Sequence, residues 1–196
     1  MADTVRRVEQ DARESLLRTA GELFMRQGYA ATGVKQLLDE SGTVVGSLYH
    51  HFPGGKREVA AEVVRREGER IGGRIAADVA ALGTRAGIDR TLGVLMESMA
   101  ASDGLEGCPI ALLAVESPIA GRAIRDEAVR QFGSWGTVIR TALVREGHAE
   151  DRAAGLAHLL LAAIEGALVL DRTAGTTTAL AALRAALPVL VPDAPG

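Results

Sequence analysis

The chain has 196 residues, a formal net charge of −3 and one cysteine, Cys108. This length suffices for one core, or for a small module beside a larger domain. The net charge gives no general basic field of the kind that draws a protein to nucleic acid. Residues 1–57 hold eight Lys or Arg against seven Asp or Glu, so a nucleic-acid role would depend on local geometry. The single cysteine excludes an intramolecular disulfide, and we expect neither a metal site nor a cofactor.

The N-terminal sequence MADTVRRVEQDARESLL lacks the apolar core of a signal peptide. No segment approaches a clean run of twenty apolar residues, the length that a membrane-spanning helix needs. We therefore expect a cytoplasmic protein with no membrane partner.

Apolar residues recur at helical spacing along the whole chain, while the alternating pattern of strands is almost absent, which predicts an all-α fold. The first helix is predicted over residues 9–27 and ends at Gly28. Its apolar stripe consists of Leu16, Leu17, Ala20, Leu23 and Phe24. Thr32 is suited to cap a short helix over residues 34–40, which Gly42 ends. A third helix follows over residues 45–51, and Pro53 with two glycines ends it.

Longer helices are predicted over residues 56–82, 88–101 and 120–146, with a short helix opening at Pro109. Two final helices fit residues 151–173 and 176–187. The composition changes near Arg57. We therefore predict a small N-terminal domain over residues 1–55 and a larger helical domain over residues 56–196, linked by the helix of residues 56–82.

Three short helices with a tight glycine turn between the second and third are typical of a helix-turn-helix. The segment GYAATGVKQLLDESGTVVGSLYHHFPGGKREV, residues 28–59, closely resembles the DNA-binding domain of TetR-family transcriptional regulators. GCPIALLAVES, residues 107–117, is similar to a ligand-domain segment of the LmrA/YxaF-like branch of that family. The resemblance implies a homodimeric helical repressor, not an enzyme, that binds a double-stranded operator and is released by a small ligand.

In that family the third helix enters the major groove of DNA, while nearby polar groups bind phosphates. The resemblance assigns these positions to Thr32, Gly33, Thr43, Val44, Val45, Gly46, Ser47, Tyr49, His50 and Lys56. Val45 departs from the common pattern, in which a polar residue often stands there. Base contacts are then left to hydroxyls and to apolar contact with thymine methyls.

Each of these assignments has an ordinary alternative. Thr32 would be only a helix cap, Tyr49 would belong to the core with Phe52, and His50 and His51 would form a solvated helix end. The Gly-Gly-Lys of residues 54–56 resembles a phosphate loop, but Arg57 follows where such a loop needs Ser or Thr, and a helix precedes it. A nucleotide-hydrolysing site is therefore excluded.

A mainly apolar cavity with one or two polar groups is typical of small-molecule sites. The helices of the second domain are expected to enclose one, lined by Leu95, Met96, Met99, Cys108, Ile110, Leu113, Glu116, Trp135, Ile139, Ile164 and Glu165. An ordinary packed core would show the same pattern. Glu97 is a further possible polar anchor. A helical enzyme would instead use two of the carboxylates of Glu97, Glu116 and Glu165 as acid and base. His148 and His158 are further polar groups that an enzyme could use.

Cys108 directly precedes Pro109 and so lies at a helix start, where the helix dipole lowers a thiol pKa and favours redox sensing. Apolar neighbours oppose this by burial, and we expect burial to dominate.

Residues 155–170 are apolar nearly all round, so this helix must be buried on two sides. A second copy of the chain is the expected cover, through residues 155–170 and 176–187. A two-fold dimer of this kind matches a palindromic operator.

Overall fold

A computed structural model describes residues 2–102, 107–116, 118 and 121–192. The described residues form helices and turns without strands, so the predicted all-α class is confirmed. Their contacts divide the chain into two units, the first of residues 1–67 and 109–129 and the second of residues 68–108 and 130–196. The predicted domain boundary, at residues 55 and 56, lies at the start of a helix that belongs to both units.

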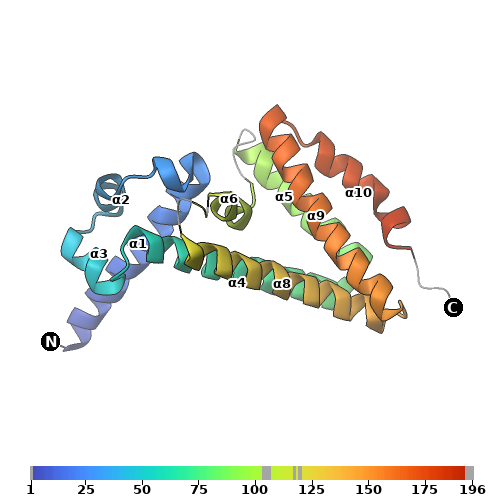
Figure 1. The fold of residues 1–196 in the computed structure, drawn as a ribbon, viewed down its shortest axis with the longest axis horizontal. Coiled ribbons are helices and arrows are strands. Elements are labelled where there is room, and N and C mark those ends of the chain that lie inside the picture. The colour runs from blue at the N-terminus through green and yellow to red at the C-terminus, as the bar shows by residue number, and fades with distance from the viewer. Residues whose placement is uncertain (1, 103–106, 117, 119–120, 193–196) are drawn as a thin grey trace. The chain divides into compact units, whose positions relative to one another are not determined.

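The first unit is built around α1 (Ala2–Ala31), on which α2 (Val34–Ser41), α3 (Val45–His51) and α6 (Pro109–Val115) pack (Figure 1). The predicted stripe of α1, from Leu16 to Phe24, is buried with at most 4% of any side chain exposed. Leu37, Leu48 and Phe52 join this core, and so do Val59 and Val63 from the first part of α4 (Lys56–Leu82). Each short helix therefore contributes one or two apolar anchors to a common centre.

The second unit contains the rest of α4, α5 (Thr84–Ala101), α9 (Glu150–Ala174), α10 (Thr178–Leu190) and most of α8 (Arg122–Arg145). Trp135 of α8 is buried, and its indole N–H donates to the carbonyl oxygen of Gly68 on α4 at 2.9 Å. A Cβ atom at Gly72 would lie only 2.8 Å from the same indole. Glycine on α4 therefore lets the two helices pack closely around the tryptophan.

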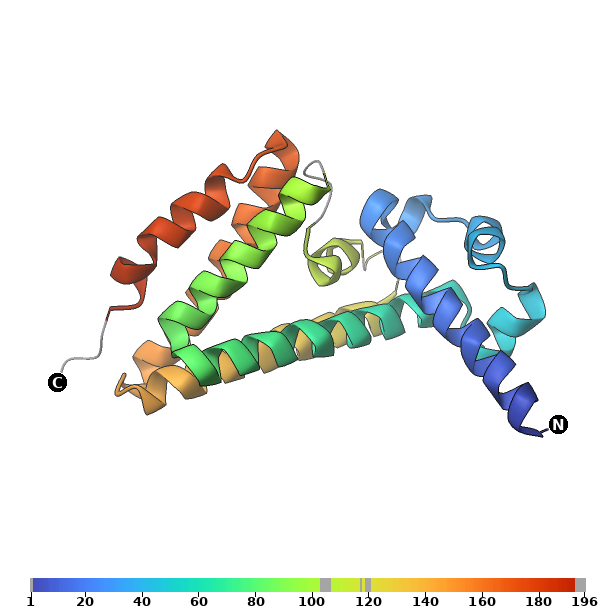
Figure 2. The ribbon, with the colours of Figure 1, turned by 180° about the vertical axis from the view of Figure 1, so that it is seen from behind.

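α10 packs against both α9 and α5, as Figure 2 shows from behind. The carboxylate of Asp171 on α9 is 1% exposed and accepts the backbone N–H groups of Ala179 and Leu180, each at 2.8 Å. Arg184 of α10 forms two hydrogen bonds of 2.7 Å with Asp89 of α5. A buried carboxylate at the start of α10 and an ion pair along it fix this helix to the unit.

Several helix boundaries differ from the prediction. α1 begins at Ala2 instead of residue 9, and the added residues include the good helix formers alanine and arginine. α5 begins at Thr84 instead of residue 88. The predicted start of the long helix at Ala120 lies outside the described residues, and α8 is described from Arg122.

Candidate nucleic-acid interface

The connection between α2 and α3 is a tight turn centred on Gly42. Gly42 is left-handed, with a φ of 66°, and it ends α2. The backbone N–H groups of Gly42 and Thr43 donate to the carbonyl oxygens of Asp39 and Leu38, which closes the last turn of α2. Val44 is extended and α3 starts at the next residue. Only three residues thus separate α2 from α3, as in a helix-turn-helix.

α3 has one buried face and one exposed face. Leu48 and Phe52 are buried, whereas Val44, Val45 and Tyr49 are 70%, 56% and 51% exposed. Gly46 and His50 are also exposed, and Thr43 and Ser47 are half-buried at the margin. The hydroxyl oxygens of Thr43 and Ser41 lie 2.6 Å apart. The exposed face therefore offers valine methyls, hydroxyls, a phenol and an imidazole, and Tyr49 is no core residue.

A left-handed glycine sets the position of Tyr49. Gly55 has a φ of 62°, and a Cβ atom there would lie 3.2 Å from Cε1 of the Tyr49 ring. The ring therefore rests on the backbone of the turn between α3 and α4. This support leaves a rigid aromatic side chain at the surface, which is suited to a phosphate or sugar contact.

Two residues that sequence reasoning assigned to phosphate binding have internal partners instead. Thr32 is fully buried, and its hydroxyl donates to the carbonyl oxygen of Gly28 at 2.7 Å, while Gly33 holds the N-cap position of α2. The Nζ atom of Lys56 donates to the carbonyl oxygens of Tyr29 and Thr32 at 3.0 and 2.7 Å. It also lies 4.0 Å from the centre of the Tyr29 ring. The structure thus gives the N-cap of α2 to Gly33 and not to Thr32, whereas the phosphate contacts of Thr32 and Lys56 stay predictions.

Lys35 is an exposed cation near this surface to which the sequence analysis gave no role. It lies in the first turn of α2, two residues after Gly33, and its side chain is 89% exposed. It pairs with Asp39 one turn later, and this contact raises the pKa of Lys35. A helix start that carries an exposed ammonium group is suited to a phosphate. Its place in the first helical turn was the available signal in the sequence.

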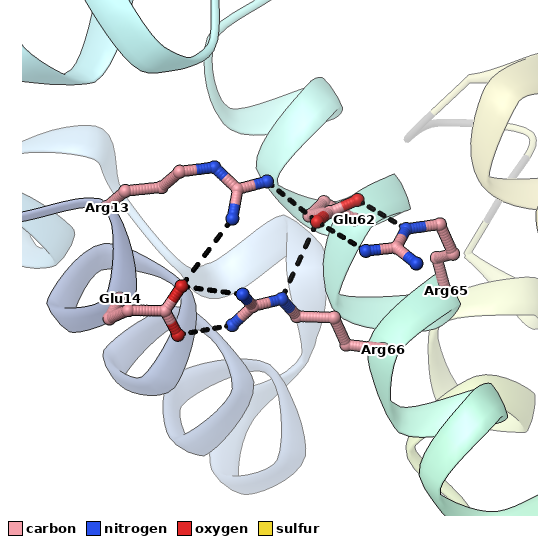
Figure 3. A network of polar contacts seen from close by, with 5 residues as sticks. All are labelled: Arg13, Glu14, Glu62, Arg65 and Arg66. Carbon is pink, nitrogen blue, oxygen red and sulfur yellow. Dashed lines mark hydrogen bonds and ion pairs between the residues drawn. The ribbon is translucent and has the colours of Figure 1, made fainter. Parts of the chain in front are cut away.

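A network of five charged side chains joins α1 to the first part of α4 (Figure 3). Glu62 accepts hydrogen bonds from Arg13 and Arg65, each at 2.7 Å, and these partners lower its pKa to about 2. Arg66 donates to both carboxylate oxygens of Glu14, and lowers the pKa of that carboxyl group. The Arg13 guanidinium also lies 5.3 Å from the centre of the Phe52 ring. The network therefore braces α4 and the end of α3 against α1.

The predicted effector site is divided between the two units. Leu95, Met96, Met99, Cys108, Trp135, Ile139, Ile164 and Glu165 belong to the second unit, whereas Ile110, Leu113 and Glu116 belong to the first. Cys108 is 7% exposed and is hydrogen-bonded to Glu165, whose pKa is raised by burial to about 6. The second carboxylate oxygen of Glu165 is buried without a partner. Cys108 and Glu165 thus form a polar pair among buried apolar side chains.

Glu116 has a different place from the one predicted. Its two carboxylate oxygens accept the backbone N–H groups of Tyr29 and Ala30 at 3.0 and 2.7 Å, at the end of α1. Its role as a polar anchor for an effector stays a prediction, and its carboxylate already has two partners in the first unit.

A hollow of about 350 Å³ in the second unit is lined by residues 82–86, Glu146, His148 and residues 191–192. It shares no residue with the predicted effector site. In the described part of the chain, no group of three or more His, Cys, Asp or Glu side chains gathers where a metal would bind.

α9 has a second, mainly apolar face that no described side chain covers. Its exposed residues at helical spacing are Gly155, His158, Leu159, Ala162, Gly166, Val169, Leu170 and Thr173. By length and composition α9 is apolar enough to cross a membrane. Leu161, in contrast, is half-buried and would contact a Cβ atom at Gly136 of α8.

The turn at Gly42, the buried anchors of α3 and its exposed opposite face define a helix-turn-helix DNA-binding protein. Residues 16–63 match the family described as bacterial regulatory proteins, tetR family, and residues 85–186 match the C-terminal domain of LmrA/YxaF-like transcriptional regulators. The chain belongs to the TetR family of transcriptional regulators. It is a DNA-binding regulator and not an enzyme.

Among curated relatives, the chain is 36% identical over 182 residues to the HTH-type transcriptional regulator LmrA of Bacillus subtilis (strain 168). The match covers 92% of this chain and 97% of that protein. A TetR transcriptional regulator from Legionella pneumophila superposes with a TM-score of 0.81 at 20% identity, over 91% of this chain and 96% of that one. The reduced form of Escherichia coli NemR gives 0.80 at 20% identity, over 93% and 98%. At such identities the solved structures support the fold alone.

Proposed function

We propose that this protein is a homodimeric repressor that leaves a palindromic operator when a small apolar molecule binds in its second unit. The observation that carries the proposal is the exposed face of α3, where Val44 and Val45 expose methyl groups next to Gly46. Exposed valine methyl groups are suited to van der Waals contact with thymine methyl groups in the major groove, and Ser47 and Thr43 would supply hydroxyl groups for hydrogen bonds. We expect the protein to act in the cytoplasm, where the operator is.

The uncovered face of α9 supports the dimer. Leu159, Val169 and Leu170 are 48%, 59% and 64% exposed on one helical face, interleaved with Gly155, Ala162 and Gly166. Exposed apolar stripes of this length mark interfaces, and the small residues let a second helix approach closely. A second copy of the chain is the proposed cover, because dimeric assembly is general among TetR regulators.

A pair of matched substitutions tests this assembly. Leu170→Glu should give a monomer by light scattering, because a carboxylate would be buried in the interface. Val129→Glu on α8 changes an equally exposed residue, 65% against 64%, outside the stripe and should leave the dimer intact. A dimeric Leu170→Glu protein would contradict the proposed interface, and its insertion into vesicles would favour a membrane role for α9.

The effector site is proposed around Cys108 and Glu165 in the second unit. Met99, Trp135, Ile139 and Ile164 supply buried apolar surface, and Glu165 with its raised pKa supplies one polar group. Effector binding would bias α4, which continues into the first unit, between two orientations. The spacing of the two α3 helices in the dimer would then match successive major grooves in only one of them.

Selection from a random duplex pool tests the whole proposal. The parent protein should enrich an inverted repeat, and a panel of apolar compounds should contain one that releases the protein from the enriched duplex. Enrichment of a sequence without two-fold symmetry would contradict the dimeric operator. Enrichment without release by any member of the panel would leave DNA binding intact and count against an apolar effector.

Redox sensing through Cys108 is a second candidate function. The place of Cys108 directly before Pro109, at the start of α6, favours it, because the positive end of a helix dipole stabilises a thiolate. Burial opposes it, because a thiolate beside a carboxyl group of raised pKa is disfavoured. We expect mild peroxide to leave DNA binding unchanged in the parent and in Cys108→Ser. Reversible loss in the parent alone would establish the redox function.

A further inference from the structure

α1 is interrupted at Gly28, and the interruption exposes backbone donors. Gly28 has φ and ψ angles of 82° and 169°, which no helical residue adopts. The next two residues, Tyr29 and Ala30, direct their N–H groups at the carboxylate of Glu116, at 3.0 and 2.7 Å. Glu116 directly follows α6 and lies 87 positions after Tyr29 in the chain. One carboxylate thus satisfies two neighbouring donors at the break in α1.

The fit between Gly28 and Glu116 is close. A Cβ atom at Gly28 would lie 2.4 Å from Oε1 of Glu116, nearer than such atoms can approach. The positive φ favours glycine at this position, and a Cβ atom there would displace the Glu116 carboxylate from its place. The absence of a side chain at Gly28 therefore lets the carboxylate sit directly against the turn.

Lys56 holds the same turn from its acceptor side. Its Nζ atom donates to the carbonyl oxygens of Tyr29 and Thr32, so the ammonium group and the Glu116 carboxylate clamp one four-residue segment. Burial lowers the pKa of Lys56 below its usual value, and the negative charge of Glu116 opposes this shift. The segment leads directly to Gly33, the N-cap of α2, and through α2 to the turn at Gly42.

We propose that Glu116 is a positioning residue of the DNA interface. Its carboxylate sets the geometry of residues 28–32, and so the entry of α2, although it lies outside residues 16–63, which carry the helix-turn-helix match. It contacts no DNA itself. Removing it therefore frees the start of α2 to move, and the exposed face of α3 loses its fixed presentation to the major groove.

Hydrogen exchange measures the contact directly in the full-length protein. In Glu116→Ala the Tyr29 and Ala30 amides should exchange at least about tenfold faster than in the parent, the effect of losing roughly one charge-assisted hydrogen bond. The amide of Leu37, inside α2, should keep its protection because it bonds to the carbonyl oxygen of Gly33. Equal exchange of Tyr29 and Ala30 in parent and variant would overturn the proposal.

DNA binding measures the consequence, with a duplex selected by the parent protein. Glu116→Ala should lose about tenfold in affinity for that duplex, because α2 and the exposed face of α3 are no longer held in one position. Glu116→Gln keeps one acceptor oxygen and the side-chain shape, and should fall between. Parental affinity in both variants would refute the positioning role.

Two further variants distinguish a positioning role of Glu116 from a general effect on the stability of the protein. Glu146 makes the same kind of contact in the second unit, where Oε1 accepts the N–H and the hydroxyl of Thr84 at 2.6 and 2.9 Å. Glu146→Ala should therefore lower stability while leaving operator affinity unchanged. Gly28→Ala should reduce operator affinity more in the parent than in the Glu116→Ala background, because the clash with Oε1 is then absent. An equal reduction in both backgrounds, or a loss of affinity in Glu146→Ala as large as in Glu116→Ala, would overturn the proposal.

Discussion

Replacing Lys56 by methionine should destabilise the first unit without altering the salt dependence of DNA binding. Methionine keeps most of the aliphatic stem and removes two charge-assisted hydrogen bonds, at 3.0 and 2.7 Å, and the ammonium group over Tyr29. Such bonds contribute about 1.5–3 kcal/mol each when fully buried. Lys56 is only partly buried, so we expect about 2 kcal/mol in total.

Urea unfolding and salt-dependent DNA binding are the two assays, with Lys35→Met as the matched control. Lys35 is exposed at the start of α2, so its replacement should leave stability unchanged. The control should flatten the plot of log affinity against log salt by about one, the contribution of one phosphate contact. If instead Lys56→Met flattens that plot and keeps its stability, Lys56 contacts a phosphate, and its internal hydrogen bonds do not persist in the DNA complex.

Four further substitutions test other parts of the account. Glu165→Gln should be more stable than the parent above pH 6 by up to about 2 kcal/mol, because burial raises the folded-state pKa from 4.5 to about 6, and stability is lost as pH rises through this window. The advantage should vanish below pH 4.5, and a pH-independent difference in thermal unfolding would refute it. Asp171→Ala should cost about 3 kcal/mol, since two N–H groups of α10 lose a buried acceptor, and an unchanged melting temperature would argue against this cap. Ser47→Ala should change the preference among operator variants, whereas Tyr49→Phe should weaken binding to all of them alike; the reverse pattern in competition assays would exchange the two roles.

The sequence predicted the helix-turn-helix well because its signals are local. Gly42 ends α2 by its own left-handed backbone, and the stripe of α1 follows from helical periodicity. Both depend on residues a few positions apart. The exposed face of α3 follows in the same way, once Leu48 and Phe52 are recognised as anchors.

The roles of polar side chains were harder to predict, because a charge at a given position does not reveal its partner. Lys56 lies at a helix start, where a phosphate contact is a reasonable expectation. In the structure its ammonium group donates to the carbonyl oxygens of Tyr29 and Thr32, some 25 residues earlier in the chain. Glu116 looked like a pocket anchor because it follows an apolar helix, and its partners lie 86 and 87 residues away. Similarly, periodicity alone does not tell which side of α9 is covered by its own unit, as Leu161 and Leu170 illustrate.

Methylation interference on the selected duplex tests most directly the claim that two copies of α3 read the major groove. Dimethyl sulfate modifies guanine N7 in the major groove and adenine N3 in the minor groove. The account predicts interference at guanines in two symmetric patches whose centres are about one helical turn, or a multiple of it, apart. A single patch, or interference confined to adenine N3, would contradict recognition by a two-fold dimer through α3.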